Sequence, residues 1–300
     1  MIDSSNKARR RRWRRLTERV IEKIVALNGA LAIIFVLLIM AFLLRDGLPV
    51  FRSVSVSEFL FGRDWYPLSD RFQALPLILG TVAVTLGAIV IALPIGVAAA
   101  VYLAEIAPVR VREILKPTVE VLAGIPSVVI GFIGMVILAP WLKGVFDLPT
   151  GMTALTGSIM LAFMAMPTII SISEDAIVAV PRDYGSGALA LGATSWQAIA
   201  GVTVPAAKSG IIAAVMLGIG RAIGETMTVL MVTGNAAVIP HSLLQPVRTM
   251  TATIAAEMGE VAQGTPHYFS LFAIGLVLFL MTFAINLIAD LALQRTRVRR

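Results

Sequence analysis

The chain has 300 residues, of which 58% are hydrophobic and 14% are charged, and its mean hydropathy is +0.88. This composition excludes an ordinary soluble domain and indicates an integral membrane protein with several spans. The net charge of +7 could suggest a nucleic-acid partner, but the basic residues concentrate beside apolar runs, so we expect membrane lipid and no nucleic acid. Cysteine is absent, and His241 and His267 form no H-x-x-x-H pair, so we expect neither a metal nor a cofactor bound by this chain.

The N-terminal segment, residues 1–23, is basic and contains KARRRRWRR at Lys7–Arg15. The apolar run Ile24–Leu44 follows it. At about 1.5 Å per residue this run can cross a hydrocarbon core of about 30 Å. It is longer than the core of about 7–15 residues in a cleavable signal peptide. We therefore predict a retained first span, with the N-terminus in the cytoplasm.

Five further apolar runs predict membrane helices, which gives an all-α protein with six spans between residues 24 and 292. Prolines interrupt several runs: Pro94 in the second, Pro126 in the third and Pro167 in the fourth. A proline removes a backbone hydrogen bond, so each of these positions predicts a kink or a break. The five runs are Leu75–Leu103, Val121–Leu142, Met152–Ile172, Ala206–Gly234 and Phe269–Leu291.

The basic residues indicate which segments lie inside. Of the 25 Lys and Arg residues, eighteen fall in predicted inner segments, six in predicted outer segments, and Arg221 falls within a span. We therefore predict that both termini are cytoplasmic, including the basic tail at 293–300, and that the segment Asn235–Tyr268 lies outside. In that outer segment, Glu257 and Glu260 could contact a binding protein, but a solvated loop face is the simpler interpretation.

Pro181–Pro205 is a segment of small residues between the fourth and fifth spans. Pro181 can open a helix, and Asp183 then lies near the positive end of the helix dipole. Gly192 can adopt the left-handed conformation that ends a helix, and Thr194 with Gln197 predicts a capping box that starts a second one. The resulting helix, glycine turn and helix would suit docking into a cleft. The alternative interpretation is an ordinary amphipathic loop between spans.

The spacing of this segment resembles the coupling-loop signature of binding-protein-dependent ABC transporter permeases: Glu-Ala-Ala, three residues, Gly, nine residues, then Ile-x-Leu-Pro. Ala188 falls on the second Ala, Gly192 on the Gly and Pro205 on the final Pro. Ser186 stands where the family has Glu, and Gly187 stands where it has the first Ala. The resemblance implies contact with a cytoplasmic ATPase through Ser186, Gly187, Ala188, Gly192 and Pro205.

The fifth predicted span contains GIGRAIGETMTVLMVTGN at Gly218–Asn235. Arg221 and Glu225 are four residues apart, which places them on one face of a continuous helix. A charge inside an apolar run costs at least about 2.5–3.5 kcal/mol, so we expect the pair to face the bundle interior or a water-filled path. One interpretation is a self-neutralising structural pair. The other is a substrate path, in which Arg221 binds an oxyanion as a planar fork and Glu225 orients Arg221.

GIPSVVIGFIG in the third span, GRAIGETMTV and TGN in the fifth, and the basic N-terminus together resemble the PstC-type permease subunits of bacterial phosphate ABC transporters. The resemblance covers nearly the whole chain. It implies a six-helix ABC importer permease bundle of type I in the bacterial inner membrane, and it alone implies phosphate. It also implies a heterodimer with a second permease, two copies of a cytoplasmic ATPase and an extracytoplasmic phosphate-binding protein. ATP would then be hydrolysed by a partner chain, and this chain would not be an enzyme.

Two alternatives remain open. A sulfate- or molybdate-type ABC permease is the nearer one, because a guanidinium alone does not separate these anions. A proton-coupled secondary anion transporter could use Glu225 as a proton relay, although such a protein has no need of a docking loop. A membrane-embedded enzyme acting on lipid phosphates would need a cluster of His, Asp or Arg at an interface, and the two isolated histidines argue against it.

Overall fold

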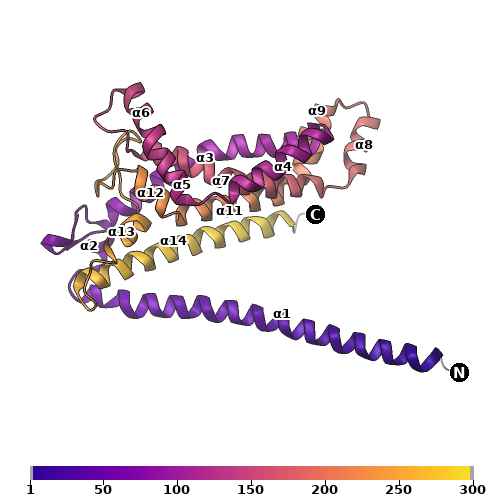
Figure 1. The fold of residues 1–300 in the computed structure, drawn as a ribbon, viewed down its shortest axis with the longest axis horizontal. Helices are drawn as coiled ribbons and strands as arrows, with labels where there is room; N and C mark the ends of the chain where they lie inside the picture. The colour runs from indigo at the N-terminus through magenta and orange to yellow at the C-terminus, as the bar shows by residue number, and fades with distance from the viewer. Residues whose placement is uncertain (1–2, 298–300) are drawn as a thin grey trace.

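A computed structural model describes residues 3–297, and it shows an almost entirely helical chain (Figure 1). Within these described residues, five helices are long and apolar enough to cross a membrane, and a bent helix pair at residues 195–224 makes a sixth candidate. The predicted all-α membrane fold is therefore confirmed. The predicted basic segments 1–23 and 293–300 fall partly outside the described residues.

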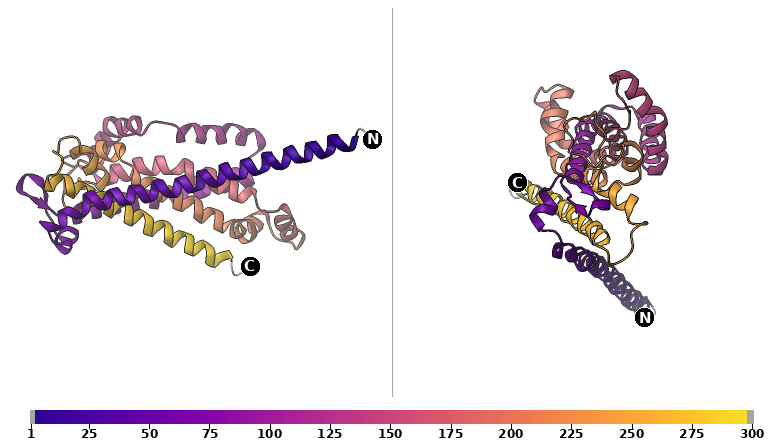
Figure 2. Two further views of the ribbon diagram at one scale, coloured as in Figure 1. Left: turned by 90° about the horizontal axis from the view of Figure 1, so that it is seen from below. Right: turned by 90° about the vertical axis from the view of Figure 1, so that its left-hand side faces the viewer.

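The first and last long helices lie side by side over only part of their length. These are α1 (Asp3–Gly47) and α14 (Pro266–Arg297). Near the end of α1, the ring of Phe42 meets that of Phe272 edge-on, with centroids 5.7 Å apart. The two helices then diverge (Figures 1 and 2), and no residue of the most apolar window of α1 is buried. A helix that is apolar all round and unburied requires lipid or another subunit around it.

The segment between α1 and α3 forms a small second core rather than a loop. Its Phe59, Trp65 and Phe72 are buried together with Leu271 of α14. This segment also contains two short strands, which pair antiparallel with Trp65 opposite Phe72. The elements are η1 (Leu48–Arg52), α2 (Val56–Phe61), β1 (Trp65–Tyr66), η2 (Pro67–Ser69) and β2 (Arg71–Phe72).

Three helices form the centre of the bundle: α3 (Leu75–Val101), α7 (Ala154–Val178) and α11 (Lys208–Gly224). Their contacts are made by small residues, because alanines and glycines let helix backbones approach closely. Gly96 and Gly218, on α3 and α11, both lie against the side chain of Ile169 on α7. Any added side chain at either glycine would collide with Ile169, so these glycines are required by packing.

The predicted start of the third span, Val121–Leu142, is wrong. The candidate membrane span begins at Ser127, after a break at Gly124–Pro126, where proline supplies no backbone N–H. Most of the predicted inner loop before it is helical. The segment consists of η3 (Tyr102–Ile106), α4 (Val109–Ala123), α5 (Ser127–Ile133), η4 (Gly134–Leu138) and α6 (Ala139–Phe146), of which η3 and η4 are π-helical.

The fifth predicted span, Ala206–Gly234, is not one helix. Its helix α11 meets the preceding helices at an angle of 68° and ends at Gly224. Glu225 then has an extended backbone, with φ −67° and ψ 134°, before α12 (Met227–Val232) begins. The prediction that Arg221 and Glu225 share one helix face is therefore wrong, because the helix stops between them.

The segment predicted to lie outside, Asn235–Tyr268, enters the core in part. Its helix α13 (Met250–Glu257) packs against α3, α12 and α14. The backbone N–H of Met250 donates to Thr81 Oγ1 at 2.9 Å, and Val247 belongs to the same core cluster as the centre of the bundle. This segment is therefore part of the helical packing.

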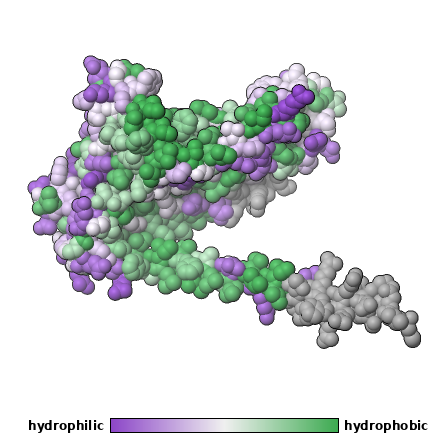
Figure 3. Space-filling view, in the orientation of Figure 1, coloured by the Kyte–Doolittle hydropathy of each residue, from purple (hydrophilic) through white to green (hydrophobic). Residues whose placement is uncertain are grey.

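The two ends of the bundle carry different elements. The N-terminal end of α1 and the C-terminal end of α14 lie at the same end of the bundle as α8 (Arg182–Ala190) and α9 (Ser195–Ala198). The helices α2, α6 and α13 lie at the other end (Figures 1 and 2). Hydrophilic residues gather at both ends and apolar residues cover the middle (Figure 3). This arrangement fits a bundle that crosses a membrane along its long axis.

Candidate functional site

Arg221 joins three helical elements near the middle of the bundle. Its Nη1 donates to Thr168 Oγ1 on α7 and its Nη2 donates to the carbonyl oxygen of Ala123 at the end of α4, both at 3.3 Å. Thr168 follows Pro167, and Ala123 precedes the break at Gly124–Pro126. The guanidinium therefore lies beside the break after α4, and a helix break is where backbone oxygens become accessible to a ligand.

The depth of this guanidinium follows from α7. Thr168 is the fifteenth of the 25 residues in that helix, so Arg221 contacts it close to the middle of a candidate membrane span. Both partners of Arg221 are neutral oxygens, and no ion pair among the described side chains includes Arg221. A charge at this depth costs about 2.5–3.5 kcal/mol or more, so an uncompensated one indicates a functional site.

Glu225 lies in the break that follows α11. Its Oε1 accepts a hydrogen bond from the backbone N–H of Thr228 at 3.3 Å, which caps the first turn of α12. No hydrogen bond or ion pair of the described residues joins Glu225 to Arg221, so the prediction that Glu225 orients Arg221 is wrong. The predicted place of both residues in a substrate path stays a prediction.

This region is open on one side. Gly124 and Pro126 in the first break are exposed. Gly224 and Met227, on either side of the second break, are also exposed, and Glu225 within it is half-buried. The charged groups therefore lie about halfway along the bundle but on an open side of it, and not in an enclosed cavity. Such an arrangement can present a cation and a carboxylate to a small ligand that moves along the surface of this chain.

The segment Pro181–Pro205 has the predicted shape. The helix α8 ends at a turn in which Gly192 has φ +92°, a conformation that side chains with a Cβ rarely adopt. The predicted capping box then starts α9. The backbone N–H of Gln197 donates to Thr194 Oγ1 at 3.3 Å, and that of Thr194 donates to Gln197 Oε1 at 2.9 Å. Helix, glycine turn and helix are thus confirmed.

Four of the five residues predicted to contact an ATPase lie on α8 and the turn after it, and the contact itself stays a prediction. Ser186, Gly187 and Gly192 are exposed on α8 and its turn, and Ala188 is half-buried there. Pro205 is exposed but lies further along the chain. It follows the π-helical η5 (Ile199–Thr203) within α10 (Val204–Ala206).

Two large side chains of this loop were missed by the sequence analysis. Leu191 is 91% exposed and Trp196 is 64% exposed, on either side of Gly192. Apolar side chains at this exposure on a short helix pair are typical of a protein contact. Their position next to the glycine turn was the available signal. We name Leu191, Gly192 and Trp196 the docking tip.

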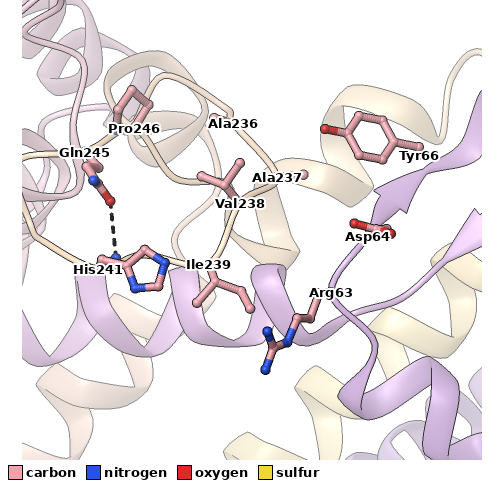
Figure 4. Close-up of a pocket in the computed structure, with 10 residues that line it drawn as sticks. All are labelled: Arg63, Asp64, Tyr66, Ala236, Ala237, Val238, Ile239, His241, Gln245 and Pro246. Carbon is pink, nitrogen blue, oxygen red and sulfur yellow. Dashed lines mark hydrogen bonds between the residues drawn. The ribbon is translucent and has the colours of Figure 1, made fainter.

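A pocket of about 520 Å³ lies at the opposite end of the bundle (Figure 4). Arg63, Asp64 and Tyr66 line it from the segment before α3, and His241 and Gln245 line it from the loop after α12. The loop is held by its own contacts, since the backbone N–H of His241 donates to Gln245 Oε1 at 3.2 Å. This pocket joins two segments that the sequence places on the outer side.

Glu257 is the centre of a polar cluster beside this pocket. Its carboxylate is within 2.6 Å of Arg248 Nη1 and 2.8 Å of His267 Nε2, and the indole N–H of Trp65 donates to both oxygens at 3.3 Å. The Glu257 side chain is only 15% exposed. The interpretation of Glu257 as part of a solvated loop face is therefore wrong. The cluster links the β-hairpin to α13 and α14.

Known proteins resemble this chain in sequence. The family model described as "Binding-protein-dependent transport system inner membrane component" matches residues 92–298. The probable ABC transporter permease protein YqgH of Bacillus subtilis is 41% identical over 249 residues, covering 82% of this chain and 81% of that protein. The phosphate transport system permease protein PstC of Mesorhizobium japonicum is 40% identical over 261 residues, covering 81% of this chain and 80% of that protein.

Solved structures resemble it in fold. A chain of the methionine ABC transporter MetNI in an inward-facing conformation superimposes with a TM-score of 0.54 at 20% identity, covering 72% of this chain and 92% of that one. A chain of an amino acid ABC transporter crystallised with histidines gives 0.52 at 18% identity, covering 73% and 92%. At these identities the likeness concerns the fold alone.

Proposed function

We propose a transport function from one premise: the chain belongs to the family of binding-protein-dependent transport system inner membrane components. It is a multi-pass inner-membrane protein with the helical bundle of type I ABC importer permeases. Within that family, we infer that it is the permease subunit of an ATP-driven importer of inorganic phosphate. It is a transport subunit and not an enzyme.

The observation that carries an oxyanion substrate is the guanidinium of Arg221. It lies near the middle of the bundle with two neutral partners, so its charge is not cancelled by a carboxylate. A planar guanidinium can bind two oxygens of a tetrahedral oxyanion side by side, which a point charge such as Lys does less specifically. Relatives named as phosphate transport system permease proteins, at 40% and 34% identity, support inorganic phosphate as that oxyanion.

The open face around the two helix breaks supports a second permease subunit. Glu225 and the exposed Gly224 and Met227 lie at a depth where lipid would otherwise contact them. Placing a carboxylate in lipid is costly, so a partner and a water-filled path should cover this face. We infer that this chain forms half of the translocation path and that a similar permease forms the other half.

The docking tip supports a separate ATPase. Leu191 and Trp196 are exposed on α9 and the turn before it, at the end of the bundle where the N-terminal end of α1 and the C-terminal end of α14 also lie. In this proposal that end is cytoplasmic, a dimeric ATPase receives α8 and α9, and ATP is bound only by that partner. The extracytoplasmic phosphate-binding protein then meets the opposite end, where the pocket around Arg63 and His241 opens.

Labelled phosphate uptake tests the substrate and the energy source. The assay compares cells that lack only this chain with complemented cells, with sulfate as competitor. The proton gradient is collapsed while ATP is maintained. We expect uptake that needs the chain, ignores sulfate and survives loss of the gradient. Uptake that fails with the gradient would favour a secondary transporter, and uptake blocked by sulfate would favour a sulfate-type permease.

Gly192→Val tests the docking loop. No heavy atom lies within 4 Å of a Cβ added at Gly192, so the change creates no clash, but it forces a β-branched residue to φ +92° at a cost of about 1–2 kcal/mol. We expect loss of coupling or of ATPase binding, measured by co-purification of the ATPase and by ATP hydrolysed per phosphate transported. Gly144→Val, the same change in open space within α6 at the opposite end of the bundle, is the matched control. Normal binding and coupling in Gly192→Val would contradict the docking role.

A further inference from the structure

The side chains of Arg221 and Glu225 are anchored on either side of the break at Gly124–Pro126, between α4 and α5. Arg221 Nη2 donates to the carbonyl oxygen of Ala123, where α4 ends. Thr228, whose N–H donates to Glu225 Oε1, also donates its hydroxyl to the carbonyl oxygen of Ser127 at 3.0 Å, where α5 begins. The guanidinium and the carboxylate therefore flank the same break, although they form no ion pair with each other.

Both charged groups keep unused binding capacity. A guanidinium has five N–H donors, and Arg221 uses two of its nitrogens in contacts of 3.3 Å, beyond the usual range of roughly 2.7–3.2 Å. Glu225 uses one carboxylate oxygen for Thr228, and no hydrogen bond of the described chain involves its Oε2. An anion at the break can thus be bound by Arg221 while one of its edges meets Glu225.

An ionised carboxylate accepts hydrogen bonds and donates none. At neutral pH inorganic phosphate still carries at least one hydrogen, whereas sulfate carries none. A phosphate held by Arg221 can therefore donate a hydrogen bond from its P–O–H to the Glu225 carboxylate. Sulfate in the same place would bring one of its own negative oxygens against a carboxylate oxygen, with no hydrogen between them. We propose that Glu225 is a specificity residue that admits hydrogen-bearing oxyanions and rejects fully ionised ones. This inference rests on the proposed function, because it assumes that the anion passes Arg221.

A purely structural role for Glu225 makes a different prediction. Capping α12 requires only an oxygen that accepts from Thr228 N–H, and the amide oxygen of glutamine supplies one. Glu225→Gln therefore keeps the cap and the side-chain shape, removes the negative charge and replaces one accepting oxygen by an NH2 donor. If capping is the whole role, the anion preference of the permease will not change.

The experiment measures equilibrium binding of labelled phosphate and labelled sulfate to the purified permease and ATPase complex. The binding protein is omitted, because it would select the anion first. We expect the wild-type complex to bind phosphate at least about tenfold more tightly than sulfate, the size of one charge-assisted hydrogen bond. Glu225→Gln should reduce this preference to about threefold or less, and Arg221→Gln should bind neither anion.

Two controls separate charge from shape. Glu113→Gln makes the same chemical change at an exposed position of α4 and should leave the preference unchanged. Monofluorophosphate, tried at mildly alkaline pH, is a tetrahedral phosphorus anion without an acidic hydrogen. The wild-type complex should reject it as it rejects sulfate, and Glu225→Gln should accept it.

Several results would overturn the inference. They are equal binding of phosphate and sulfate by the wild-type complex, an unchanged preference in Glu225→Gln, binding of monofluorophosphate as tight as that of phosphate, or no anion binding at all. Failure of the proposed function is a separate result, because it appears as chain-independent phosphate uptake in cells. Chain-dependent uptake together with any of the four binding results would remove only the specificity role of Glu225.

Discussion

Two half-buried arginines of this chain have opposite surroundings. Arg248 lies 2.6 Å from a carboxylate oxygen of Glu257, which also binds His267 and Trp65. Among the described side chains and backbone, the partners of Arg221 are the hydroxyl of Thr168 and a backbone carbonyl, each at 3.3 Å. The first charge is compensated and closely held. The second is neither.

The difference indicates different uses of the same side chain. A compensated charge has little field left for a ligand, and breaking such a buried pair is strongly destabilising. The Arg248 cluster therefore stabilises the junction of the β-hairpin, α13 and α14. An uncompensated guanidinium keeps its attraction for a passing anion, so Arg221 is the better candidate for substrate. The two regions are connected, because Thr251 on α13 donates its hydroxyl to the carbonyl oxygen of Glu225 at 2.7 Å.

The largest expected effect tests the uncompensated arginine. Arg221→Gln removes the charge and the fork, and with two charge-assisted hydrogen bonds lost we expect phosphate uptake to fall by about 100-fold or more. The permease should still assemble, because only two weak contacts to neutral oxygens are lost. Labelled uptake, divided by the amount of permease complex in the membrane, measures this effect.

Arg221→Lys is the matched control for Arg221→Gln. It keeps the charge but not the planar fork, so it should retain part of the uptake. Retained transport in Arg221→Gln would show that the residue is structural or dispensable, and the contrast with Arg248 would lose its functional meaning.

The compensated arginine should respond in stability and not in transport. Glu257→Gln leaves Arg248 without a carboxylate, and Arg248 Nε is already buried without a partner. We expect a loss of about 3–5 kcal/mol of stability, seen as a lower thermal unfolding midpoint and less complex in the membrane. The complex that does assemble should transport at a normal rate per molecule.

Glu260→Gln, at an exposed position three residues further along the chain, should have almost no effect on stability. A Glu257→Gln permease of unchanged stability but impaired transport would reverse our assignment of the two arginines.

Local signals in the sequence predicted the fold and the docking loop. Apolar runs placed every span except the fifth to within eight residues at each end. Gly192 and the Thr194–Gln197 capping box are confirmed because such turns depend on neighbouring residues alone. The break at Glu225 was not predicted. Gly224 was its only local signal, and a single glycine in an apolar run is compatible with an unbroken helix.

Long-range partners explain the other errors. Glu257 was expected in solvent, but it binds Trp65, which lies 192 residues earlier in the sequence. No periodicity or spacing identifies such a pair. Likewise, the neutral partners of Arg221 lie 53 and 98 residues away, so sequence reasoning assigned it the nearest carboxylate. The substrate-path residues could be named from the sequence, but their mutual arrangement could not.

The smallest expected effect concerns a third polar contact. Its cation is paired with carboxylates, as Arg248 is, but it is more exposed to solvent than Arg248. Lys116 Nζ lies 2.5 Å from Glu174 Oε2 and 2.9 Å from Asp175 Oδ1, joining α4 to α7 before the candidate span that begins at Ser127. Glu174 is buried, but the Lys116 side chain is 35% exposed, so solvent screens the pair. We expect Lys116→Met to cost about 1–2 kcal/mol, less than Glu257→Gln, because water can still reach Glu174 from the lysine side.

The pH dependence of this contact follows from the same geometry. Hydrogen bonds to Glu174 first, and then to Asp175, raise the pKa of Lys116 above its ordinary value of 10.5. Its stabilising contribution is therefore complete below that value and is lost only as the pH rises through the higher pKa of the folded state. The difference in unfolding midpoint between wild type and Lys116→Met should be constant across neutral pH, with exposed Lys143→Met as the control. A difference as large as that of Glu257→Gln would mean that partial exposure does not weaken a carboxylate contact here, and exposure could then no longer be used to rank the charged pairs of this chain.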